Sequence, residues 1–540
     1  MTIESSAPLH VRVDAFLRRY SWPLFFLLTA VASIRVVSTY AVFSFTSDEP
    51  AHIAAGMEWL DKGKYTYEPQ HPPLARVMTA ILPYLAGSRS QNMAQIWPEG
   101  WAILNAGGHY KRTLALARLG VLPFFWLAAL VTFLWTKRYW GEAIALFATF
   151  FFTFLPAILA HSGLATTDIA LTATFGAAFY TMLVWLEDPS LKTAIWFGVA
   201  VAGAALSKFS SLPFLATTVL AGSCAYLWSE RPPLRQLFQL LKSRLLTLAV
   251  AAMLASVLIW AGYRFSFARI PAPEFFAGIE QVRAHNALGH PSYLLGRISN
   301  SGFWWFYPVA LGMKTPLALL ILAGVGTVWC FTRFNRGFKY WMPFALAIGI
   351  LAVGFYSRIN IGIRHILPIY FPICMLAALG THRMLSARQA VFRWATAGLI
   401  SWLVVSSAFA HPDYLSYFNE LAGSHPEKVL VDSDLDWGQD MYRLAARLKE
   451  VGATQVAVDP IIIRNPEIVH DFPPLVPLNP DAPVPGWNAV SLSLLKLRTG
   501  MFAENSRAVP WPERLPPTMR IGHSTLLWYV QPSEVTPQIP

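Results

Sequence analysis

The chain has 540 residues, of which 55% are hydrophobic and only 13% are charged. Soluble domains usually carry about 25% charged residues, so this composition argues against a soluble protein and predicts an integral membrane protein. The net charge is +12. Because the basic residues lie largely in short breaks between apolar runs, where orientation signals belong, we do not expect a nucleic-acid partner.

The apolar runs predict an α-helical polytopic membrane protein. A spanning helix needs roughly 20 mainly apolar residues. We count about eleven such runs, of which the fifth and ninth are short, so the number of spans is predicted to within one or two. The runs are 21–45, 113–135, 141–160, 168–186, 193–207, 211–228, 245–266, 315–331, 341–356, 365–380 and 394–410.

The distribution of Lys and Arg predicts the orientation. With the N-terminus (1–20) in the cytoplasm, the short cytoplasmic breaks are strongly basic, as the positive-inside rule requires. We expect a multi-pass protein of a cell inner (plasma) membrane. We find no removable signal peptide. The segments then expected on the extracytoplasmic side are 46–112, 161–168, 207–210, 267–314, 357–364 and 411–540.

Two domains follow from this pattern. Residues 21–410 form the transmembrane domain, whose first outer loop, 46–112, is the predicted catalytic loop. The tail 411–540 is polar and rich in proline, and we expect a small α/β domain there. Its predicted elements are a helix at 437–450 and strands at 454–459, 488–494 and 524–530.

Two adjacent carboxylates, Asp48 and Glu49, directly follow the first apolar run. Charges are costly to desolvate at this position, which suggests that they have a function, although a solvated helix cap is the alternative. Further along the loop, His71 is followed by Pro72 and Pro73, which fix it near the membrane surface. A single histidine is more often structural than catalytic.

Two basic residues break the charge pattern. Arg364 lies in a turn that is expected on the outer face, where the positive-inside rule predicts few arginines. Lys208 lies in an apolar hairpin with similar placement. An arginine that only anchors its helix at the interface is the alternative interpretation.

The order of these motifs resembles a known family. The pair Asp48-Glu49 after the first helix, then His71-Pro72-Pro73-Leu74, then Arg118 at the start of the second helix, is similar to the protein O-mannosyltransferases. It also resembles the lipid A aminoarabinose transferases of bacteria. These families are membrane glycosyltransferases of the C superfamily, and the resemblance covers most of residues 20–410.

The resemblance implies a reaction. Such an enzyme moves a sugar from a polyprenyl-phosphate donor to an acceptor hydroxyl on a protein, lipid or glycan, with inversion. It implies that Asp48 activates the acceptor, that Glu49 accompanies it, and that Asp168 is the second carboxylate. Alternatively, Asp168 only stabilises a helix N-terminus, by about 0.3–1 kcal/mol. Relatives often carry arginine before this second acid, whereas here His161 stands nearby.

The resemblance also implies where the donor binds. A lipid phosphate needs cations, and one cation about 4 Å away contributes about 4 kcal/mol at an effective dielectric of 20. The predicted phosphate-binding residues are Arg364, Lys208, His365, Arg118 and Lys314. The predicted substrate-binding histidines are His71, His52 and His161. Phosphate carries its charge before the reaction and no His/Cys ligand pattern is present, so we predict no metal and no cofactor.

The aspartates between Asp432 and Asp436 are a candidate cation site. They do not form an EF-hand loop, because the glycine is one place late and Arg443 occupies the twelfth position. A turn before a helix fits better.

Two other functions compete with transfer. A transporter or flippase would explain charges within the membrane, but no paired repeat is evident. A scaffold with a partner-binding tail would give Asp48, His71 and Arg364 no reason to converge.

Overall fold

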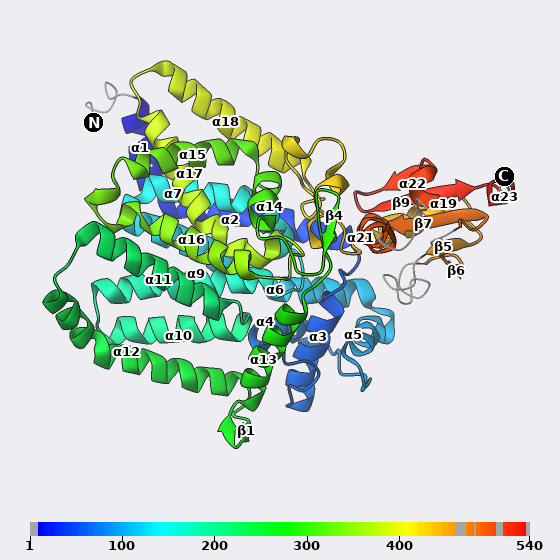
Figure 1. Ribbon diagram of the computed structural model, residues 1–540, viewed down its shortest axis with the longest axis horizontal. Coiled ribbons are helices and arrows are strands. Elements are labelled where there is room, and N and C mark those ends of the chain that lie inside the picture. Colours follow the sequence, from blue (N-terminus) through cyan, green and yellow to red (C-terminus); the bar gives the residue numbers. More distant parts are fainter. Residues whose placement is uncertain (1–8, 459–470, 480–481, 504–510, 536–540) are drawn as a thin grey trace.

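The computed structural model describes residues 9–458, 471–479, 482–503 and 511–535. A large helical bundle occupies most of the molecule, with helix α1 (Leu9–Arg19) at one end and a small sheet at the other (Figure 1). We call these the N-terminal end and the sheet end of the bundle. Residues 1–8 of the predicted N-terminal segment, and parts of the predicted tail domain, lie outside the described residues.

The predicted apolar runs are helical. The helices that contain them are α2 (Ser21–Ser38), α6 (Tyr110–Trp140), α7 (Glu142–Phe154), α8 (Pro156–Ser162), α9 (Asp168–Glu187), α10 (Leu191–Ser207), α11 (Ser211–Glu230), α12 (Leu234–Gly262), α15 (Leu317–Phe331), α16 (Met342–Tyr356), α17 (Tyr370–Leu385) and α18 (Ala390–Phe409). Short 3-10 or π turns lie between helices of the chain: η2 (Thr39–Ala41), η3 (Glu58–Lys62), η4 (Ala106–Gly108), η5 (Phe334–Arg336), η6 (Phe338–Tyr340), η8 (Glu420–Ala422) and η9 (Pro426–Lys428).

The predicted count of about eleven spans is not confirmed. Among the described residues, seven helices are long and apolar enough to cross a membrane, or nine if each of two bent pairs is one span. The pair α7 and α8 bends by 64°, and α14 (Phe306–Lys314) bends by 114° against α15. The two runs that are short in the sequence, α10 and α16, have 17 and 15 residues and fall below the required length.

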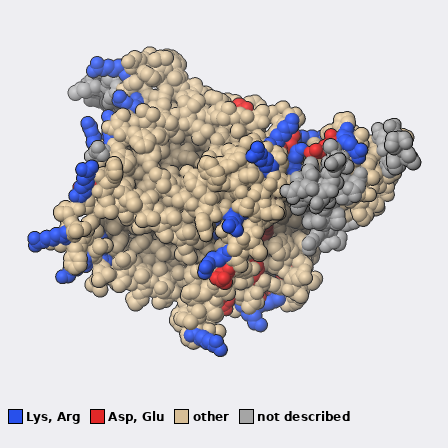
Figure 2. Space-filling view, in the orientation of Figure 1, with Lys and Arg blue, Asp and Glu red and all other residues tan. Residues whose placement is uncertain are grey.

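The surface fits a lipid environment. A wide belt without charged side chains separates the basic groups at the N-terminal end from the charges of both signs at the sheet end (Figure 2). Large apolar side chains are exposed on α11 and α12, including Trp228, Phe238 and Leu246. Exposed apolar area of this extent is typical of a surface that contacts lipid.

Two glycines allow α15 and α17 to pack closely. A Cβ at Gly326 of α15 would lie 1.8 Å from the carbonyl oxygen of Leu376, and one at Gly380 of α17 would lie 2.1 Å from that of Leu322. Small residues at helix crossings permit such close backbone approach in membrane proteins.

We predict that Gly326→Ala destabilises the protein by about 1–3 kcal/mol, because the added methyl group overpacks the α15–α17 crossing. Gly324→Ala is the matched control, since a Cβ there meets nothing within 4 Å. Thermal unfolding in detergent should show a lower melting temperature for Gly326→Ala only. Equal melting temperatures for the two variants would contradict this packing.

The sheet end carries the two long loops. The first contains α3 (Glu49–Met57), α4 (Pro73–Leu85) and α5 (Ile96–Asn105). The second contains α13 (Pro273–Leu288) and two small hairpins, whose strands are β1 (Phe267–Ala268), β2 (Ile270–Pro271), β3 (Ser292–Leu294) and β4 (Arg297–Ser299). Gly56 brings α3 against α4, since a Cβ there would lie 1.9 Å from the carbonyl oxygen of Arg76.

The C-terminal region contains a helix and strands where they were predicted, but residues 492–494 of the second predicted strand begin a helix, and two of the five strands were not predicted. Its five-stranded sheet has the order β6-β5-β7-β9-β8, with β5 parallel to β6 and β7, and β9 antiparallel to β7 and β8. Residue 459 of the first predicted strand lies outside the described residues. The elements are α19 (Met441–Glu450), β5 (Val456–Val458), β6 (Leu475–Pro477), β7 (Gly486–Ser491), α21 (Leu492–Ala503), α22 (Trp511–Arg514), β8 (Met519–Ile521), β9 (Thr525–Val530) and α23 (Pro532–Val535). The division of the chain into domains stays a prediction.

Candidate active site

A segment just before the C-terminal sheet builds one wall of the site. The backbone N–H of Ser44 donates to the carbonyl of Gln439 at 3.1 Å, and that of Ser47 donates to the carbonyl of Trp437 at 3.0 Å. The segment 430–440 therefore lies directly against the start of the first loop. This contact brings residues from opposite halves of the chain next to the predicted acidic pair.

Glu49 and Arg118 form a buried ion pair. The guanidinium of Arg118 donates from Nε and Nη2 to the two carboxylate oxygens, each at 2.8 Å, and neither side chain is more than 1% exposed. The same carboxylate accepts backbone N–H groups of Thr46 at 2.7 Å and Ala165 at 2.8 Å. Arg118 also donates to the carbonyls of Phe43 and Ser44.

These contacts change the roles predicted for two residues. Glu49 is surrounded by donors, and Arg118 is directed at the carboxylate and at backbone carbonyls. Both therefore join the first loop, α6 and the turn before α9. We infer a structural role for the pair in place of the predicted catalytic and phosphate-binding roles.

Asp48, by contrast, is partly open. It is the N-cap residue of α3, and its side chain is 31% exposed. Its Oδ2 accepts a hydrogen bond from Nη1 of Arg364 at 3.1 Å. Arg364 comes from η7 (Ile363–Ile369) and is 8% exposed. The carboxylate and the arginine that the sequence predicts to converge are in direct contact.

The wall segment holds Arg364 in place. The Nε of Arg364 donates to the hydroxyl of Ser433 at 2.9 Å, and its guanidinium carbon lies 4.1 Å from the ring centroid of Trp437. Neither contact was foreseen from the sequence, because Ser433 and Trp437 belong to a segment that we interpreted only as a turn before a helix.

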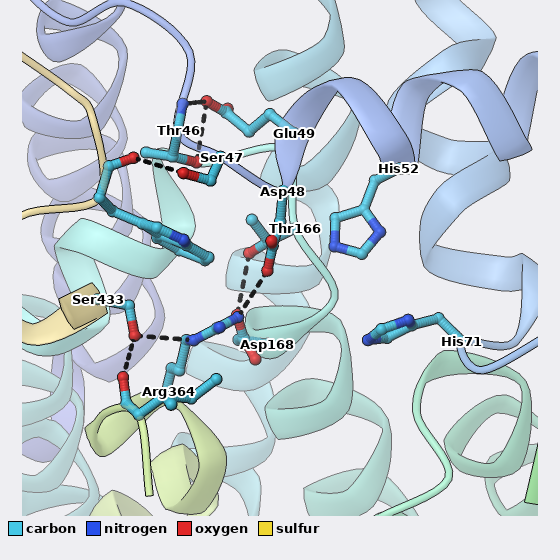
Figure 3. Close-up of polar contacts among 12 residues, drawn as sticks. Thr46, Ser47, Asp48, Glu49, His52, His71, Thr166, Asp168, Arg364 and Ser433 are labelled. Carbon is cyan, nitrogen blue, oxygen red and sulfur yellow. Dashed lines mark hydrogen bonds and ion pairs between the residues drawn. The ribbon is translucent and has the colours of Figure 1, made fainter. Parts of the chain in front are cut away.

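A second carboxylate completes the cluster. Asp168, at the start of α9, is fully buried and accepts a hydrogen bond from Nζ of Lys208 at 2.6 Å. Its other oxygen lies 3.8 Å from Nη1 of Arg364. Two carboxylates and two cations thus alternate in the order Asp48, Arg364, Asp168, Lys208, and Figure 3 shows Arg364 between the two acids.

The four predicted histidines differ in their position and in their burial. His52 and His71 lie on one side of Asp48, with ring centroids 5.2 Å apart (Figure 3). Burial lowers the pKa of both, so both are neutral near pH 7. His161 is buried in α8, and its Nδ1 has no hydrogen-bond partner among the described residues. His365 follows Arg364 in η7 and is half-buried.

Lys314 is not available for a phosphate. Its side chain is 2% exposed, and its Nζ donates to the carbonyls of Leu415 at 2.8 Å and Asp434 at 2.5 Å. It joins the sharp bend between α14 and α15 to the segment after α18. As for Arg118, we infer a structural role in place of the predicted phosphate-binding role.

The aspartates of the wall segment are also engaged by the protein. Asp434 accepts the backbone N–H of Ile363 at 3.0 Å, and Asp436 accepts N–H groups of Gly438 and Ser493. Burial raises the pKa of Asp436 to about 6. Within the described part of the chain, no group of three or more His, Cys, Asp or Glu side chains is arranged to hold a metal ion. That the reaction needs no metal stays a prediction.

Comparisons with known proteins find a family model and solved structures that are similar to this chain. A family model described as dolichyl-phosphate-mannose-protein mannosyltransferase matches residues 58–268, which include His71, Asp168 and Lys208. The chain is similar in structure to ArnT from Cupriavidus metallidurans bound to undecaprenyl phosphate, with 15% identity and a TM-score of 0.51 over 95% of this chain and 99% of that chain. The chain therefore shares its fold with this ArnT structure. The resemblance expected from the motifs is confirmed.

Two further structures are similar. The apo state of the same ArnT has 14% identity and a TM-score of 0.50, again over 95% of this chain and 99% of that chain. The oligosaccharyltransferase AglB from Archaeoglobus fulgidus has 15% identity and a TM-score of 0.44 over 79% of this chain and 58% of that chain. A direct comparison with curated protein sequences finds no match.

We predict that Arg118→Met destabilises this glycosyltransferase fold by about 3–5 kcal/mol, because it leaves the Glu49 carboxylate buried without its charge partner. Arg138→Met on the same helix is the matched control. It removes a half-exposed pair with Glu187, and such pairs contribute about 0–1 kcal/mol. Thermal unfolding in detergent measures both effects. A stable Arg118→Met protein that had lost only donor affinity would restore the phosphate-binding role.

Proposed function

We propose that the protein transfers a sugar from a polyprenyl-phosphate donor to an acceptor hydroxyl, with inversion at the anomeric carbon. The observation that carries the proposal is the contact at 3.1 Å between Asp48 and Arg364, which are 316 residues apart in the chain. A partly exposed carboxylate therefore lies beside an arginine that is held in position and can bind an anionic phosphate. The match to a mannosyltransferase family and the likeness to a structure bound to undecaprenyl phosphate support this donor class.

The two carboxylates suit different tasks. Asp48 is partly exposed and, within the described residues, its Oδ1 has no hydrogen-bond partner, so it can accept the proton of an acceptor hydroxyl. Asp168 is fully buried and contacts both Lys208 and Arg364. We assign it the role of fixing these two cations, since a buried carboxylate aligns its partners without reaching the substrate.

The cations suit the leaving group. Arg364 and Lys208 retain small exposed fractions of 8% and 12%, so part of each head group can meet a ligand. A preorganised cation in a site with little water stabilises charge more strongly than it does in bulk solvent. The phosphate is already anionic in the donor, and these residues hold its charge as the sugar departs to the acceptor oxygen. His365 and His161 complete the proposed binding residues.

We place the site on the extracytoplasmic side of the inner membrane, with the N-terminus in the cytoplasm. Basic groups at the N-terminal end of the bundle support this orientation (Figure 2). The acceptor is a protein, lipid or glycan hydroxyl. The comparisons give no support to the alternative of a transporter or flippase.

Asp48→Asn should abolish sugar transfer while the protein stays folded, because the amide keeps the shape and removes the base. Asp188→Asn, just beyond the opposite end of α9, is the matched control and should transfer normally. Mass spectrometry of lipid-linked sugars and glycoconjugates, with each variant expressed in a deletion strain, measures the outcome. Normal transfer by Asp48→Asn would remove this carboxylate from the mechanism.

Arg364→Ala should lower turnover by about 10²–10³, the scale observed when one charge-stabilising donor is lost. The control is Arg358→Ala, which removes an exposed arginine whose guanidinium contacts a backbone carbonyl. Initial rates with purified proteins test the difference. A loss of less than about threefold for Arg364→Ala would mean that the arginine only anchors η7.

A further inference from the structure

One buried arginine connects the two histidines of the first loop. Arg76 lies in α4 and is 1% exposed. Its Nε lies 3.1 Å from Nδ1 of His52, and its Nη2 lies 3.1 Å from Nδ1 of His71. A single planar group therefore contacts the same ring nitrogen of both imidazoles.

The N–H groups of this arginine decide which atoms accept. A guanidinium has five N–H donors and no acceptor. Nη1 donates to the carbonyl of Glu68 at 2.9 Å and to the hydroxyl of Tyr65 at 3.3 Å, and one Nη2 hydrogen meets the carboxylate of Glu68. The remaining two N–H groups point to the histidines. Among the described residues, Nδ1 of His52 contacts only Nε of Arg76, so it accepts and carries no proton. Nδ1 of His71 lies 3.1 Å from Nη2 of Arg76 and 3.4 Å from Oε2 of Glu68, and we assign the shorter contact as the hydrogen bond, which makes this nitrogen an acceptor as well.

We infer that Arg76 is a positioning residue that holds His52 and His71 as neutral Nε2–H tautomers, so that two N–H donors face hydroxyl oxygens of the donor's sugar. The inference rests on the proposed function, because the ligand is the sugar of that donor. A neutral imidazole has one N–H, and the partner of one ring nitrogen decides where it is.

The surroundings keep both rings uncharged. Burial is the largest effect on each pKa and lowers it, and the positive charge of Arg76 acts in the same direction. The carboxylate of Glu68, whose Oε2 lies 3.4 Å from Nδ1 of His71, raises the pKa of that ring. This carboxylate is, however, already paired with Arg76. The charged and titratable groups that face the two rings are Glu68, Arg76, Asp168, Lys208 and His285.

The two Nε2 atoms are free for a ligand. Among the described residues, neither has a hydrogen-bond partner, and the His71 side chain is 25% exposed. In Figure 3 both rings lie on the same side of Asp48. In the proposed function Arg364 and Lys208 hold the phosphate. The uncharged N–H donors of the two histidines are therefore left to bind hydroxyl groups of the sugar. A sugar that lacked these hydroxyls would leave the donors unpaired, which a buried site penalises.

The tautomers can be measured without substrate. We expect ¹⁵N NMR of histidine-labelled protein in detergent to show protonated Nε2 and unprotonated Nδ1 for His52 and His71 between pH 6 and 8, with assignment by loss of each signal in His52→Gln and His71→Gln. In Arg76→Lys, one ammonium cannot serve both rings, so at least one should change tautomer or titrate. Arg89→Lys, at an exposed arginine of the same loop, should leave both signals unchanged. A protonated Nδ1 in the unsubstituted protein would overturn the inference.

The ligand class is tested by two lipids. Undecaprenyl-phosphate mannose should shift the Nε2 signals, whereas undecaprenyl phosphate alone should leave them in place. Equal shifts with both lipids would show that the histidines bind phosphate, and no shift with the mannose lipid would remove them from sugar binding. Absence of sugar transfer by the unsubstituted protein would instead contradict the proposed function, while the tautomer result would stand.

Two isosteres of His71 provide a readout in activity. Glutamine places an amide donor near the Nε2 position, whereas asparagine places its polar group near the Nδ1 position. With undecaprenyl-phosphate mannose, His71→Gln should retain about threefold to tenfold more kcat/KM than His71→Asn, the scale of one hydrogen bond. Equal losses in the two variants, or a better asparagine variant, would contradict donation from Nε2.

Discussion

Burying a charge requires a partner, and this constraint organises the sheet end of the bundle. Among the described residues, three buried arginines lie there, each paired with a carboxylate: Arg118 with Glu49, Arg76 with Glu68, and Arg364 with Asp48 and Asp168. A desolvated ion without such partners would cost several kcal/mol. The pairs of Arg118 and Arg364 also join segments that are distant along the chain, so satisfying these charges fixes how the loops sit on the helices.

The three pairs differ in what they leave open. Arg118 and Glu49 are fully enclosed, and we infer from this burial that their contacts hold the loop. Arg76 is equally buried, but it contacts two imidazoles, and that of His71 is partly exposed. Arg364 meets a carboxylate that is 31% exposed. Exposure, and not residue type, therefore separates a structural ion pair from one that can take part in chemistry.

The apolar runs of the sequence were sufficient to predict the helices, because a run of about 20 apolar residues has few alternatives to a buried or lipid-facing helix. The short runs that became α10 and α16 show where this argument weakens, since length no longer distinguishes a span from an internal helix. The strands β5, β7 and β9 were also predictable, because alternating apolar residues favour a sheet with one buried face, whereas the short edge strands β6 and β8 were not predicted. How the strands order in the sheet was not predictable, because pairing depends on contacts distant in sequence.

By itself, the sequence determined that the chain is a helical membrane protein whose polar chemistry gathers in a few loops. Charges beside apolar runs are conspicuous in local composition, and they drew attention to Asp48 and Arg364. The roles predicted for Asp168 and His71 depended on the resemblance to a known family. Only the tertiary structure decided which carboxylate faces outward, which cations are already satisfied, and that Ser433 and Trp437 support Arg364. These outcomes depend on desolvation and on the geometry of individual N–H groups, which arise when distant segments pack together.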